Sequence, residues 1–257
     1  MDQTASLLKR GWRVLQKNPA GLLAAAAWPY LGVFVAAAIA RAFILRYANL
    51  DDSPTEPLAL WNSAGPLTRV GIVLSYLFYI SVSQSLAVAG VSVMSLEDNL
   101  GGNSTFLRAL VQVGRRLFPL IALSFLVGFL TTLLASIVPL VGPFIVQTIF
   151  LPSAVVVLML EKTRVGVFTS FRTSLGLTAD ALPTIIGVGI VGVGAFAAIT
   201  AGLIRVRMST GVSGVFFTFA ALVSFILVVP PAIALILGVV LASSYYDRRF
   251  RATDPEA

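Results

Sequence analysis

The chain has 257 residues, of which 58% are hydrophobic and only 11% are charged, and its mean hydropathy is +0.94. A soluble domain carries about 25% charged residues, so this composition excludes an ordinary water-soluble domain and indicates that lipid surrounds the protein. The chain contains neither cysteine nor histidine. Their absence excludes disulfides, Cys/His zinc sites, Ser-His-Asp triads and histidine proton relays.

Six long apolar runs predict six membrane-spanning helices, because a helix needs roughly 20 mostly apolar residues to cross a bilayer. The runs are residues 21–45, 67–95, 117–136, 142–160, 181–204 and 215–246. A polar loop at 47–66 follows the first run, whereas a short turn joins the third and fourth runs into a hairpin. We therefore expect an all-α, polytopic membrane helical bundle, with residues 1–250 as one integral membrane domain and 251–257 as a short cytoplasmic tail.

The last run is long and contains the pair Pro230-Pro231. As one helix it would extend about 48 Å at 1.5 Å per residue, whereas two halves of about 15 residues each would be too short to cross a bilayer. Two spans would also move the basic residues after the run to the opposite side. We therefore predict one span that is kinked at the prolines.

The positions of the basic residues predict the orientation. With six spans, both termini lie on one side, and most of the 18 basic residues lie on that side in clusters between the runs. The positive-inside rule then places both termini in the cytoplasm of a prokaryotic cell, with the protein in its plasma membrane. Clusters that flank apolar runs are typical of membrane orientation, so no nucleic-acid partner is expected. The first run is expected to be a retained signal anchor.

Three spans begin at a proline, namely Pro19, Pro119 and Pro183, and an amphipathic segment precedes each of them. Apolar residues recur at helical spacing in these segments, for example at Leu107 and Val111, and basic residues lie opposite. This pattern predicts three hairpin units, each with a cytoplasmic amphipathic helix. The candidate contacts to anionic lipid are Arg108, Arg115, Arg116 and Arg172. The alternative is that the helices only anchor and orient the bundle.

Polar residues in the second and fourth runs allow two interpretations. The residues concerned are Ser75, Tyr79, Ser83, Gln84 and Gln147. They line a path for a small solute, or they hold helices together through interhelical hydrogen bonds, which is the commoner role. In the fifth run, Gly194, Ala198 and Gly202 follow one another at four-residue steps and predict close helix packing.

No acidic residue or lysine lies inside an assigned span, which argues against a proton-coupled transporter. The acidic pair Glu97-Asp98 precedes a loop, and a helix is expected to start at Asn103 or Ser104. No recognised acid–base or metal-ligand spacing is present, so we expect no enzymatic activity, no metal and no cofactor.

Two short motifs resemble the membrane domain of glycerophosphoryl diester phosphodiesterases and its stand-alone relatives in prokaryotes and archaea. One is Glu161 followed by an amphipathic segment with Arg172 and Ser174, and the other is Tyr246-Asp247-Arg248 after the last run. The resemblance implies a six-span helical membrane domain of no established activity. The catalytic barrel of the full-length enzymes has no counterpart in this sequence, which also lacks their catalytic histidines.

Taken together, the sequence predicts a non-enzymatic structural or accessory membrane module that interacts with lipids or with partner membrane proteins. The alternative function is a passive or facilitated transporter of small solutes.

Overall fold

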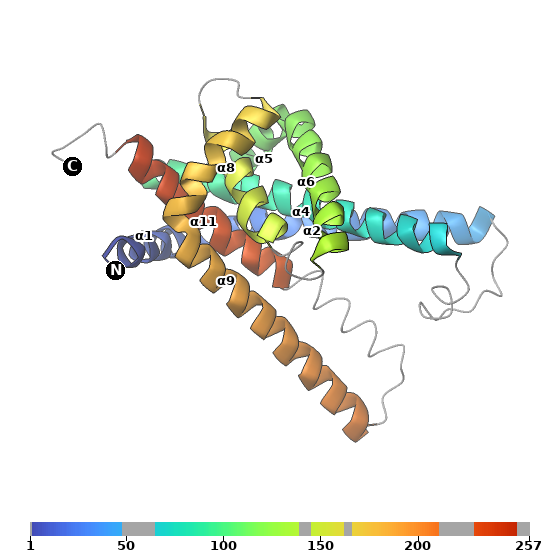
Figure 1. Cartoon of the computed structure of the whole chain (residues 1–257). Helices are drawn as coiled ribbons and strands as arrows, with labels where there is room; N and C mark the ends of the chain where they lie inside the picture. The colour runs from blue at the N-terminus through green and yellow to red at the C-terminus, as the bar shows by residue number, and fades with distance from the viewer. Residues whose placement is uncertain (1, 48–64, 139–144, 162–165, 211–228, 251–257) are drawn as a thin grey trace.

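The computed structural model describes residues 2–47, 65–138, 145–161, 166–210 and 229–250 (Figure 1). Within these ranges the protein is helical and contains no strand, which confirms the all-α prediction. The elements are α1 (Asp2–Lys17), α2 (Pro19–Tyr47), α4 (Pro66–Asn99), α5 (Phe106–Arg115), α6 (Leu117–Ile137), the π-helix η1 (Ile145–Phe150), α8 (Leu151–Leu160), α9 (Val167–Thr210) and α11 (Val229–Arg249).

Three helical segments in the described residues are long and apolar enough to span a membrane: Phe78–Asn99 of α4, Leu117–Leu134 of α6, and α11. A fourth is added if the two parts of α9 on either side of its bend form one span. The apolar stretch Ile145–Leu160 is shorter than these. The helices therefore suit insertion into a membrane, while the number of six spans stays a prediction.

Each predicted amphipathic segment forms a helix that meets the next one at a break or bend. α1 ends before Asn18, whose side-chain oxygen accepts from the Gly21 amide at 3.1 Å and so caps α2. α5 and α6 are separated at Arg116. In α9, the parts before and after residue 180 meet at 88°, because Pro183 has no N–H for the carbonyl four residues earlier. At all three places the amphipathic segment therefore forms a helical part of its own before the apolar one, while its position at the membrane surface stays a prediction.

α4 is the central helix of the bundle. Every residue from 83 to 95 is buried, and α4 packs against α2, α6, α8 and α11. Small residues permit the closest approaches. A Cβ on Gly238 of α11 would lie 2.7 Å from the side chain of Val91, and one on Gly90 would lie 3.4 Å from that of Ala25. Close approach through small residues is the usual packing mode of helices in lipid.

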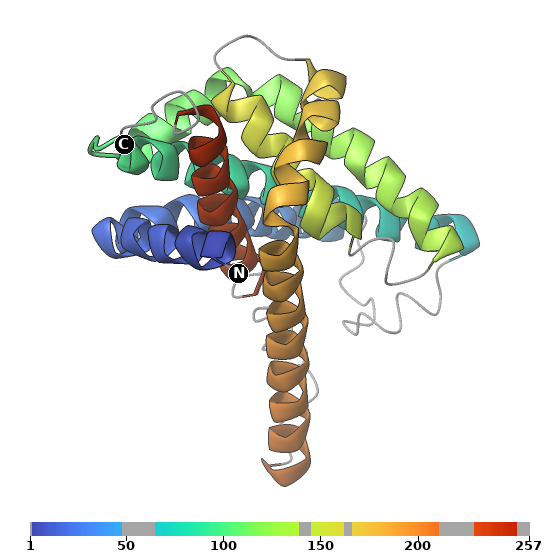
Figure 2. The ribbon, with the colours of Figure 1, turned by 60° about the vertical axis from the view of Figure 1, so that its left-hand side comes forward.

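The second half of α9 projects away from the other helices (Figures 1 and 2). Ile190 and Val191 are 64% and 68% exposed. A Cβ added at Gly194 or Gly202 would meet no atom within 4 Å, and Ala198 is exposed. The close packing predicted for these small residues is therefore not made with any described residue.

The sequence predicts that each half of the last run is too short to cross a membrane, and for the second half this prediction is wrong. Within the described residues, α11 runs from Val229 and includes Pro230 and Pro231 near its beginning. The helix continues past the apolar residues to Arg249 and reaches 21 residues. This half is long enough to cross a membrane by itself. Residues 215–228 lie outside the described residues, so the choice between a kink and a split is not tested.

Candidate functional site

A buried polar cluster joins α4, α6 and η1 in the middle of the bundle. Gln84 Nε2 donates to the backbone oxygen of Gln147 at 2.9 Å. The side chain of Gln147 donates from Nε2 to Ser81 Oγ at 2.6 Å and to Thr131 Oγ1 at 3.2 Å. The structure thus brings together Gln84 and Gln147, two of the residues that the sequence singled out.

Pro152 explains why this cluster forms at η1. In a π-helix, each carbonyl accepts from the N–H five residues later. For the Gln147 carbonyl that residue is Pro152, which has no N–H. Gln84 supplies the missing donor from α4. In lipid, such a carbonyl must find a partner inside the protein, so Gln84 compensates for the proline.

Serines extend the cluster along α4 and α6. Ser124 Oγ donates to Ser85 Oγ at 2.8 Å, and both residues are fully buried. Ser85 Oγ also donates to the Ser81 carbonyl within α4 at 2.7 Å. The side-chain oxygen Oε1 of Gln147 is buried and has no hydrogen-bond partner among the described residues. The cluster therefore keeps one free acceptor.

The other predicted path residues, Ser75, Tyr79 and Ser83, also belong to α4. The Tyr79 hydroxyl donates to the Tyr30 carbonyl of α2 at 3.4 Å. Ser83 is fully buried on α4, and the side chain of Ser75 lies outside the described residues. The sequence interpretation missed Ser124 and Thr131. Their separation by seven residues, which places them on one face of α6, is the signal that identifies them.

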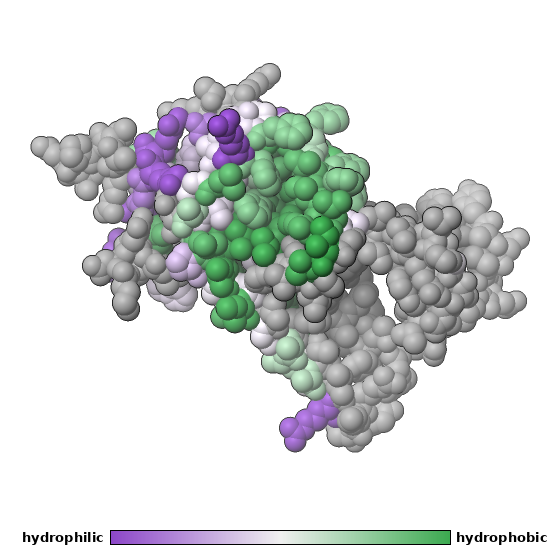
Figure 3. All heavy atoms as spheres, in the orientation of Figure 1, coloured by the Kyte–Doolittle hydropathy of each residue, from purple (hydrophilic) through white to green (hydrophobic). Residues whose placement is uncertain are grey.

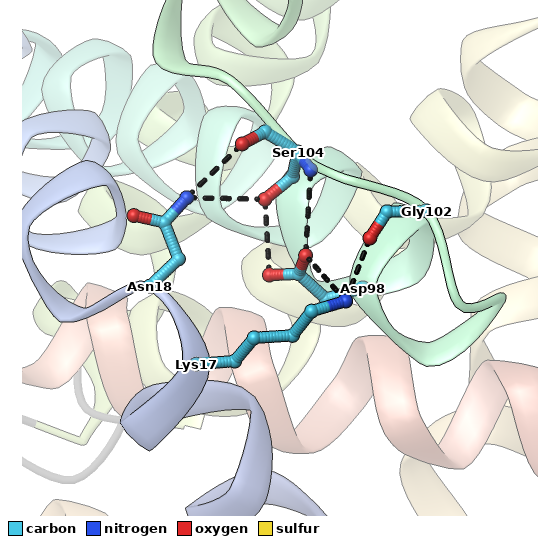
Figure 4. Close-up of polar contacts among 5 residues, drawn as sticks. All are labelled: Lys17, Asn18, Asp98, Gly102 and Ser104. Carbon is cyan, nitrogen blue, oxygen red and sulfur yellow. Dashed lines mark hydrogen bonds and ion pairs between the residues drawn. The ribbon is translucent and has the colours of Figure 1, made fainter.

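A second polar cluster joins the α1–α2 junction to the loop before α5 (Figure 4). Asp98 is only 8% exposed, and it accepts from Ser104 Oγ at 2.9 Å and pairs with Lys17 at 3.5 Å. Asn18 donates to the Ser104 carbonyl at 3.1 Å. Because Ser104 is engaged in this way, the predicted helix start is wrong, and Thr105 is the N-cap of α5.

The family-like motif residues lie at the same end of the molecule, in two groups. Glu161 accepts from the Tyr245 hydroxyl at 2.9 Å and from Arg249 at 2.7 Å. Asp247 pairs with Arg10 of α1, whose guanidinium lies 5.1 Å from the ring centroid of Tyr246. These contacts connect α1, α11 and the end of α8.

The remaining motif residues are on or near α9. A Cβ at Gly176 would lie 2.7 Å from the guanidinium of Arg248, so this arginine packs closely over α9. Ser174 is fully buried and donates to the Phe171 carbonyl at 2.7 Å. Arg172 is exposed. The described contacts of the motif residues are therefore contacts within the protein.

The predicted lipid-contact arginines differ in their surroundings. Arg116 donates to the carbonyls of Leu158 and Glu161, the latter at 3.1 Å, and so satisfies the C-terminal end of α8. In contrast, Arg108 and Arg115 are exposed on α5. They line a shallow groove of about 330 Å³, and the residues that form it are Leu107, Arg108, Val111, Gln112 and Arg115.

In length and composition, the apolar helices among the described residues are suited to an α-helical membrane protein. No protein-family model, curated protein or solved structure matches the chain. The resemblance to the phosphodiesterase membrane domain therefore stays a hypothesis that rests on its short motifs.

Proposed function

We propose that the protein is a non-enzymatic, multi-pass accessory module of a prokaryotic plasma membrane, and that it interacts with anionic lipids through the helices at its cytoplasmic side. One observation carries the proposal. On three separate helices, a large apolar side chain and an arginine are both exposed to the surroundings. The pairs are Trp12 with Arg13, Leu107 with Arg108, and Phe168 with Arg172.

Exposure of this kind is unfavourable in water and favourable at a membrane surface. Trp12, Leu107 and Phe168 are 62%, 72% and 78% exposed. In the headgroup plane, such side chains enter the acyl region while the neighbouring guanidinium groups remain among the phosphates. A basic residue close to an anionic leaflet contributes about 1 kcal/mol of attraction. Hydrophilic residues also gather around α1 and the end of α11, whereas hydrophobic residues cover the body of the bundle (Figure 3).

The test is purification from the native membrane in mild detergent, followed by mass spectrometry of the retained lipids and proteins. The proposal predicts that anionic phospholipids are enriched over their share of the whole membrane. A protein partner in stoichiometric amounts would support the accessory role and identify the process. Retained lipid with the composition of the bulk membrane, and no partner, would overturn the proposal.

The buried cluster at η1 favours a second candidate function, the passage of a small polar solute. The observation is the free acceptor Oε1 of Gln147, because a buried oxygen without a donor is able to bind a hydroxyl or amide group of a solute. Uptake of glycerol and urea into proteoliposomes tests it. This function predicts faster uptake than in protein-free liposomes and a loss of the difference with Gln147→Leu. Equal uptake with and without the protein would exclude it.

A further inference from the structure

We propose that α5 carries a binding site for one anionic phospholipid, with the headgroup phosphate held between Arg108 and Arg115. This inference rests on the proposed function and names the place and the chemistry of one lipid contact. The site is the groove that lies along α5.

The two arginines are spaced to act on one headgroup. They are seven residues apart, so they lie on the same face of α5 about 10 Å apart along its axis. Side chains of that length reach a phosphate placed midway, and guanidinium groups bind phosphate oxygens through paired N–H bonds. Gln112 lies between them and donates to Glu97 at 3.2 Å, which leaves the groove with two positive charges against one negative charge.

Four of the other basic residues are paired within the protein, in contrast to the two arginines of the groove. Arg10 pairs with Asp247, Lys17 with Asp98, and Arg249 with Glu161, while Arg116 binds the end of α8. Each of these four side chains has an acceptor within the protein. Neither Arg108 nor Arg115 makes a side-chain hydrogen bond or ion pair with any described residue. Their guanidinium groups are available for an external anion, and they line a groove with room for it.

The apolar part of the groove identifies the anion as a lipid. Leu107 and Val111 are 72% and 54% exposed beside the arginines. Phe118, one residue after the start of α6, is 85% exposed as well. An acyl chain that lies on these side chains buries apolar area, which a soluble phosphate does not do. The ligand class is therefore an anionic glycerophospholipid.

The experiment measures the binding of phosphatidylglycerol and phosphatidylcholine to the purified full-length protein by native mass spectrometry in detergent. The variant Arg108→Gln/Arg115→Gln is compared with Lys9→Gln/Arg205→Gln, which removes the same charge from exposed positions outside the groove. We expect one phosphatidylglycerol per protein at the highest-affinity site, at least a tenfold weaker affinity in the first variant, and a change below twofold in the control. Circular dichroism confirms that both variants are folded.

Three outcomes would overturn the site. Equal weakening by both variants would show that only total charge matters, and unchanged affinity in both would show that the lipid binds elsewhere; in either case the proposed function stands. Competition by glycerol phosphate at the same concentration as the lipid would show that the groove binds the headgroup alone. If the unaltered protein does not prefer phosphatidylglycerol to phosphatidylcholine, the proposed function fails together with the site.

Discussion

Replacement of Gln84 tests whether this side chain compensates for Pro152. Gln84→Leu removes the donor to the Gln147 carbonyl and leaves that carbonyl buried without its partner from α4. The same replacement in a Pro152→Ala background has a different consequence. Alanine at 152 has an N–H, so the chain itself is able to satisfy the carbonyl.

The expected magnitude follows from the environment of the bond. A buried polar group that loses its partner costs about 1–3 kcal/mol, whereas single interhelical hydrogen bonds in lipid average about 0.6 kcal/mol. We therefore expect Gln84→Leu to lower the free energy of unfolding by about 1–2 kcal/mol in the natural background. In the Pro152→Ala background the loss falls below about 0.5 kcal/mol, which leaves a coupling of about 1 kcal/mol between the two positions.

The assay is reversible unfolding in mixed micelles by titration with dodecyl sulfate, followed by circular dichroism. Ser153→Ala is the matched control, because its buried hydroxyl donates at 2.9 Å to the Ile149 carbonyl within the same helical segment. It is expected to cost the same in both backgrounds. If Gln84→Leu lowers the free energy of unfolding equally with and without Pro152, Gln84 does not replace the N–H that Pro152 lacks.

Three further predictions use the same unfolding assay. Gly101 has a φ of +81°, so Gly101→Ala should destabilise the protein by about 1 kcal/mol. Gly114→Ala inside α5, where a Cβ meets no atom, should be neutral or stabilise by up to about 1 kcal/mol. Equal effects of the two variants would show that the positive φ of Gly101 does not determine the loss. Arg116→Gln should cost about 1.5–3 kcal/mol because it removes charged hydrogen bonds to the end of α8. Arg115→Gln should change the stability by no more than about 0.5 kcal/mol. A larger loss for Arg115→Gln than for Arg116→Gln would contradict the structural role of Arg116. Gly238→Ala should cost about 1–3 kcal/mol through its clash with α4, and an unchanged midpoint would show that the two helices separate easily.

The sequence predicts the elements of this protein better than their contacts. The prolines at 19, 119 and 183 mark the places where a short amphipathic helix leads into an apolar one, because proline is accepted in a first turn and disrupts a helix interior. The apolar runs also identify α4, α6 and α11 as helices suited to a membrane. These features depend on local composition and spacing, which the sequence states directly.

The partners of individual polar side chains could not be predicted in the same way. Arg108, Arg115 and Arg116 look alike in sequence, yet only Arg116 lies where it reaches the end of α8. Likewise, Ser104 is a good N-cap by residue type, but its hydroxyl binds Asp98 and the cap passes to Thr105. Both outcomes depend on which segments meet in space, and a single sequence does not contain that information.

The contact between α1 and α11 has a consequence for how the protein is made. Arg10 and Asp247 are 237 residues apart, so at a synthesis rate of about 5–20 residues per second the second residue follows the first by about 10–50 s. Throughout that interval α1 has no partner on α11, and Gly11 lacks the Val239 side chain on which it later packs. The apolar face of α1 therefore stays without this part of its packing until α11 has been synthesised. The bundle closes at this end only after its last helix has been made.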